Sequence, residues 1–174
     1  MANTGQSAFS VADLFAEREA RRHRDKAAEE QLQRKQQEEL AQFKKRLDEF
    51  KVTPEIATSV LDRIRRAFER GETELMLSSF PSSFCSDSGR AIINAGAPPI
   101  NKPTREEAAA AKDREPEWLG TLPAGGREVY EFWKANLKPG GFALTARILN
   151  YPGGMPGEVG LFFSWPKSAM DAGA

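Results

Sequence analysis

The sequence has very few of the residues that catalytic and metal centres use. Cys85 is the only cysteine and His23 the only histidine among 174 residues. A single cysteine excludes an internal disulfide and indicates a reducing compartment. The single histidine has no second ligand and no partner base beside it. We therefore expect no metal site, no cofactor and no catalytic constellation, and hence a protein that is not an enzyme.

Long apolar runs and an excess of one charge are also missing. No apolar run approaches the roughly 20 residues that a membrane-spanning helix needs, and Met1–Phe15 lacks the basic start and apolar core of a secretory signal. The 25 Lys and Arg residues balance the 25 Asp and Glu residues, so no global field attracts nucleic acid or acidic lipid. We expect a soluble, cytoplasmic protein with no membrane partner.

Proline and glycine are absent from Ser10 to Phe50, where Ala, Glu, Lys, Arg, Gln and Leu dominate. These residues favour helix over a long stretch. Ser10 is placed as the N-cap, with Asp13 three residues later as a shortened capping box. The sequence predicts a charged helical arm over residues 10–52, preceded by a disordered N-terminus over residues 1–9.

Apolar side chains gather at the two ends of this arm. Leu40, Phe43, Leu47 and Phe50 follow a heptad spacing that fades upstream at Gln36 and Gln33. Two interpretations remain open: this stripe packs on the chain's own domain, or it pairs with a helix of a partner protein or a second copy. The candidate partner-binding residues are Phe9, Leu14, Phe15, Leu40, Phe43, Leu47 and Phe50.

Residues 53–166 read as one α+β domain. A helix starts at Thr53-Pro54 and ends at Gly71, and a second starts near Pro123 and runs to about Leu137. Glu72–Phe80 predicts a strand with Leu75 and Leu77 on one face and Met76 and Phe80 on the other. Gly140–Pro166 predicts a β-hairpin, which needs that strand and the helices to be stable. The predicted fold is thus a small two-layer domain with a mainly antiparallel three-stranded sheet covered by helices. In the second helix we expect Val129, Phe132, Trp133 and Leu137 on the buried side and Tyr130 at its border.

The connections contain one candidate ligand loop. Serine density marks Ser82–Arg90 as a loop in which Asp87 or Ser88 caps a short helix. Four residues separate Cys85 from Arg90, whereas a cysteine-phosphatase loop has five, and no histidine is available as base. We expect Cys85 to be a small buried thiol; the alternative is a ligand loop of Cys85, Asp87 and Arg90. Residues 97–117 read as a mobile linker with a short helix capped by Thr104 and Glu107, and residues 167–174 as a disordered tail.

The function that these features favour is a non-enzymatic protein–protein interaction or assembly module. The helical arm would contact a protein partner or a second copy of the chain. The alternative is a nucleic-acid-binding protein, whose phosphate contacts would come from two basic segments: Arg63–Arg70 and the cluster of Arg18, Arg21, Arg22, Arg24 and Lys26.

Overall fold

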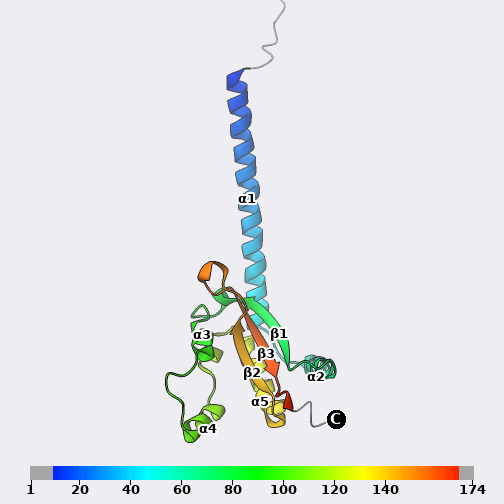
Figure 1. Cartoon of the computed structure of the whole chain (residues 1–174). Helices are drawn as coiled ribbons and strands as arrows, with labels where there is room; N and C mark the ends of the chain where they lie inside the picture. The colour runs from blue at the N-terminus through cyan, green and yellow to red at the C-terminus, as the bar shows by residue number, and fades with distance from the viewer. Residues whose placement is uncertain (1–9, 169–174) are drawn as a thin grey trace, which may run out of the picture. The chain divides into compact units, whose positions relative to one another are not determined.

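The computed structural model describes residues 10–168, which form five α-helices and one three-stranded sheet (Figure 1). The helices are α1 (Val11–Asp48), α2 (Pro54–Glu69), α3 (Arg90–Gly96), α4 (Arg105–Asp113) and α5 (Gly125–Asn136). The strands are β1 (Glu74–Pro81), β2 (Ala143–Ile148) and β3 (Glu158–Ser164). The long first helix and the sheet confirm the predicted α+β class. Within residues 10–168, no helix combines the length and apolar character that crossing a membrane requires.

The chain divides into two compact units, residues 1–43 and 44–174. In the first unit, α1 begins as its capping signal predicts: the Asp13 backbone N–H donates to Ser10 Oγ at 3.1 Å, and Ser10 Oγ donates to Asp13 Oδ2 at 2.6 Å. The second unit contains the last turn of α1 together with all other helices and strands.

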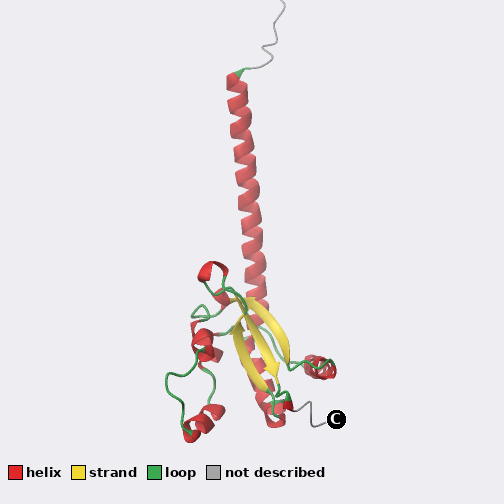
Figure 2. Ribbon diagram, viewed as in Figure 1, coloured by secondary structure: helices red, strands yellow, loops and turns green. Residues whose placement is uncertain are grey.

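The sheet of the second unit has strand order β1-β3-β2, and both pairings are antiparallel (Figure 2). The predicted hairpin is present, with Ala143 opposite Ser164 and Ile148 opposite Val159. Its return strand, β3, is the central strand, and the stretch from Val159 to Phe163 is buried. Because β3 pairs on both edges, β1 provides the third strand that stabilises the hairpin.

A β-bulge in β1 changes which of its side chains face the core. The register shifts between Met76 and Ser78, so that Leu77 is the extra residue and Phe80 pairs with Val159. Beyond a bulge the inward and outward positions exchange. Met76 is 44% exposed and Phe80 only 3%. The prediction that Met76 and Phe80 share a face is therefore wrong, because strict alternation does not continue through the extra residue.

Helices α2 and α5 cover one face of the sheet; Figure 1 shows α2 beside β1 and α5 behind the strands. The centre of this core is a cluster of buried residues: Ile64, Ala67, Leu137, Phe163 and Trp165. Val129, Phe132 and Trp133 pack around the cluster, as their spacing predicts. Tyr130 was expected at the border of α5, but it is 3% exposed. That expectation is wrong because the 3₁₀ turn Glu117–Thr121, with its buried Trp118, packs against α5.

The connections between these elements follow their local signals. Thr53 caps α2 by accepting the Ile56 N–H at 3.3 Å. The predicted helix in the 97–117 segment is α4, and its capping box is present: Thr104 Oγ1 accepts the Glu107 N–H, and Glu107 Oε2 accepts the Thr104 N–H. Such caps satisfy the first N–H groups of a helix from within a few residues.

Candidate functional site

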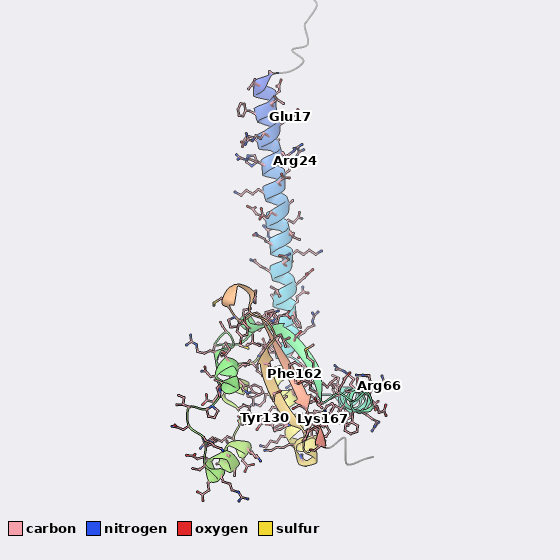
Figure 3. All side chains as sticks on the ribbon, in the orientation of Figure 1. Glu17, Arg24, Arg66, Tyr130, Phe162 and Lys167 are labelled. Carbon is pink, nitrogen blue, oxygen red and sulfur yellow. The ribbon has the colours of Figure 1, made fainter. Side chains whose placement is uncertain are left out.

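Helix α1 carries large apolar side chains in contact with solvent. None of its 38 residues is buried. Val11, Leu14 and Phe15 share one face of the first turns by their helical spacing, and Phe15 is 60% exposed. Leu32 and Leu40, farther along, are 57% and 46% exposed. In Figure 3 side chains stand out from α1 along its length, with Glu17 and Arg24 labelled on it. Val11, Leu14 and Phe15 therefore form a small exposed apolar patch at the start of α1, whereas Leu32 and Leu40 are exposed apolar residues without such neighbours.

The heptad stripe at the end of α1 is divided between two environments. Leu47 and Phe50 are half-buried and line a cavity of the second unit, so this half of the stripe packs on the chain's own domain. Phe43 is also half-buried, whereas Leu40 is exposed. Of the other candidate partner-binding residues, Leu14 and Phe15 are exposed, and Phe9 lies outside the described residues. The exposed candidates are therefore Leu14, Phe15 and Leu40. Leu32 lies between Gln31 and Gln33 in a polar stretch, so no apolar pattern in the sequence singles it out.

The last turn of α1 is joined to the start of α5 by specific contacts. Asp48 Oδ1 accepts the Ala124 backbone N–H at 3.0 Å. This hydrogen bond and the nearby Lys44 lower the pKa of the Asp48 carboxyl from its ordinary value, against the raising effect of desolvation. At Gly125 a Cβ atom would collide with the Leu47 carbonyl oxygen and lie 2.8 Å from the Phe50 Cβ. The close approach of the two helices thus requires glycine at this position.

A cavity of about 220 Å³ lies among α2, α5, the sheet and the segment Leu47–Val52. Its walls are mainly apolar and include Val60, Val129 and Phe163. Arg63 is the one charged residue among those that line it, and its Nη2 donates to the Met76 carbonyl at 2.9 Å. Chemically this cavity offers apolar contact, and its lining contains no acid–base pair for catalysis.

In the candidate ligand loop, Cys85 is buried and Asp87 forms hydrogen bonds within the loop itself. The pKa of the Cys85 thiol is raised to about 11 by burial and secondly by the charge of Asp87, so the thiol is protonated at neutral pH and is a poor nucleophile. Asp87 accepts the N–H groups of Gly89 at 3.0 Å and Ala91 at 2.7 Å at the start of α3, but the N-cap of α3 is Gly89, so the prediction of Asp87 or Ser88 at that position is wrong. Arg90 is exposed. None of the three loop residues lines the cavity, and a ligand role for them stays a prediction.

The basic segments proposed for nucleic acid have acidic neighbours. In α2, Arg65 pairs with Asp62 at 3.1 Å, and just beyond it Arg70 pairs with Glu72 at 2.9 Å. In α1, Arg22 pairs with Glu19 at 3.5 Å. Surface pairs of this kind reduce the positive potential available to phosphates. Nucleic-acid binding stays a prediction that no contact in the described residues favours.

In residues 10–168, no group of three or more His, Cys, Asp or Glu side chains is placed to hold a metal ion. Comparisons of the chain with protein-family models, with curated proteins and with solved structures give no match. What the chain does must accordingly be inferred from its own residues.

Proposed function

We propose that this chain is a non-enzymatic protein–protein interaction module that makes its contact through α1. The observation that carries the proposal is the exposure of large apolar side chains at both ends of a 38-residue helix without a buried residue. Burying one such side chain is worth about 1.5–3 kcal/mol. A partner that covers Phe15 and its neighbours would therefore be stabilised by burial of apolar surface that is exposed in the isolated chain.

The charge of α1 suits such contacts. Between Val11 and Asp48 the sequence has 10 basic and 9 acidic residues, a net charge of +1. Because both signs are interspersed, the helix neither repels a copy of itself nor attracts polyanions as a whole. The apolar positions then supply affinity, while the charged positions select the partner and its orientation.

The test compares the full-length chain with the double variant Leu14→Gln/Phe15→Gln, because Gln keeps helix propensity and removes the apolar surface. Analytical ultracentrifugation measures the mass of the wild-type chain and of the variant over a range of concentrations. In a second experiment, both proteins are immobilised, and the lysate proteins that bind to each of them are compared. Ala16→Gln is the matched control at an exposed site, and circular dichroism checks the helix content.

Two results support the proposal. One is a mass above 19.3 kDa that rises with concentration and falls back in the double variant. The other is a retained protein that, once purified, binds the wild-type chain at least about tenfold more tightly than the variant, which corresponds to about 1.4 kcal/mol. A monomeric mass for both proteins together with identical retained proteins would overturn the proposal.

A further inference from the structure

Two of the exposed apolar residues of α1, Phe15 and Leu40, lie at seam positions of one heptad frame. When Leu40 is placed at position a, the d positions upstream of it are residues 36, 29, 22 and 15, so Phe15 lies at a d position. Both side chains are exposed. The a and d positions between them hold polar residues: Glu19, Arg22, Lys26, Glu29, Gln33 and Gln36. A seam with apolar ends and a charged middle is stable only in an alignment that sets no like charges opposite one another.

Parallel pairing of two copies fails this requirement. In a parallel, in-register coiled coil each a or d residue faces its own equivalent. Glu19, Lys26 and Glu29 would each meet a like charge, and so would Arg22. Like charges opposite one another are destabilising. The sequence of α1 thus disfavours a parallel dimer at four successive layers.

Antiparallel pairing satisfies the requirement at every one of these layers. In an antiparallel coiled coil, a positions face d positions of the partner. When Phe15 is set against Leu40 of the second copy, Lys26 faces Glu29 of that copy, and the reciprocal contact repeats the pair. The remaining layers join Glu19 to Gln36 and Arg22 to Gln33, so no like charges meet. One register therefore covers Phe15 and Leu40, pairs Lys26 with Glu29 and sets no like charges opposite one another.

The positions that flank the seam agree with this register. Position g of one helix lies beside position g of the antiparallel partner. Arg18 then lies beside Glu39 of the second copy, an opposite-charge pair that occurs twice in the dimer. The 57% exposed side chain of Leu32 lies at g beside Asp25 of the second copy, at the edge of the seam. Leu14 falls at position c and remains outside.

We propose that the partner of α1 is a second copy of this chain, paired antiparallel over Phe15–Leu40. The inference rests on the proposed function, since it names the partner of the same helix. The paired segment is 26 residues, or about 39 Å of helix. It lies within the unit formed by residues 1–43. Only the Phe15–Leu40 contact, which occurs twice, contributes apolar burial along this seam, so the dimer is weak and depends on salt concentration.

Disulfide trapping of the full-length chain tests the orientation. Glu19→Cys and Gln36→Cys are made separately, then oxidised alone and as a mixture. In the antiparallel register, residue 19 of one copy faces residue 36 of the other, whereas the two residues 19 are about 25 Å apart. We expect the mixture to give a mixed disulfide dimer and each variant alone to remain monomeric. The wild-type chain, whose Cys85 is buried, measures the background.

A charge-reversal cycle tests the register. Lys26→Glu and Glu29→Lys should each weaken the dimer about tenfold, because two attractive contacts become repulsive. The double variant should return to within about threefold of wild type. Glu17→Lys, at the outward f position labelled in Figure 3, is the matched control and should change little. Unchanged affinity in both single variants would overturn the register.

The outcomes separate this inference from the proposed function. Cysteine variants that crosslink equally well alone would show a parallel dimer, which overturns the antiparallel inference and leaves the interaction function standing. No crosslinks, combined with a purified partner that Leu14→Gln/Phe15→Gln no longer binds, would show that the partner is a different protein. No crosslinks and no such partner would overturn both.

Discussion

The guanidinium carbon of Arg147 lies 3.9 Å from the centroid of the Phe162 ring. Arg147 extends from β2 and Phe162 from the neighbouring β3, on the face of the sheet opposite the helical core. The same guanidinium forms an ion pair with Glu74 of β1 at 2.8 Å. One side chain therefore spans all three strands, which explains how Phe162 is only 6% exposed on this face. Figure 3 labels Phe162 on the sheet.

Arg147→Ala should lower the free energy of unfolding by about 1–2 kcal/mol, because it removes the cation–π contact and the aliphatic stem that covers the ring. Glu74→Gln removes only an exposed ion pair and should cost less than about 1 kcal/mol. Urea denaturation measures both values. A larger loss for Glu74→Gln than for Arg147→Ala would contradict the covering role.

Gly125→Ala should destabilise the domain by about 2 kcal/mol or more, because the added Cβ collides with the Leu47 carbonyl oxygen. The matched control is Gly120→Ala, since a Cβ at Gly120 has nothing within 4 Å. That control should stay within about 0.5 kcal/mol of wild type. Thermal and urea unfolding of the full-length proteins give the comparison. Equal effects at the two glycines would show that the contact is not tight.

The pKa of Asp48 is lowered in the folded chain, so its ionised form stabilises the fold at neutral pH. Because the unfolded carboxyl keeps its ordinary pKa near 3.8, this contribution is complete above that value. It is lost as the pH falls below 3.8 through the folded pKa. The stability difference between wild type and Asp48→Asn should therefore be present at pH 7 and shrink below pH 3.8. A difference that is constant over this range would exclude the carboxylate as its source.

Val129→Ile should stabilise the protein by up to about 1 kcal/mol, because the added methylene can enter the 220 Å³ cavity. Both side chains are β-branched, so helix propensity changes little. Differential scanning calorimetry should show a higher melting temperature. A loss of stability would indicate that the cavity cannot accept the extra carbon at that wall.

Cys85 should react slowly with a thiol reagent in the folded protein, because its thiol is buried and its pKa is raised to about 11. At pH 7 the reaction should proceed at the rate at which the chain opens, and it should become fast in denaturant. Rapid labelling of the native chain, at the rate of the unfolded one, would contradict this environment.

The sequence by itself determined the features that depend on neighbours within a few residues. The helix starts at Ser10, Thr53 and Thr104 follow from side chains that accept N–H groups three residues away. The long run without proline and glycine determined α1, and the apolar alternation around a Pro/Gly turn determined the β2–β3 hairpin. These signals are local, so they can be read before any packing is known. The apolar positions near the two ends of α1 were readable for the same reason, whereas their exposure was not.

Only the tertiary structure decided the features that depend on distant parts of the chain. The bulge at Leu77, which turned Phe80 inward, appears only when β1 is aligned with β3. The burial of Tyr130 depends on a turn that packs against α5 from outside it. Gly125 is required because Leu47, distant in sequence, approaches it, and the same approach assigned Leu47 and Phe50 to the domain. Contacts of this kind depend on how distant elements pack against one another. Heptad spacing cannot reveal them, because it is the same whether a helix packs on its own domain or on a partner.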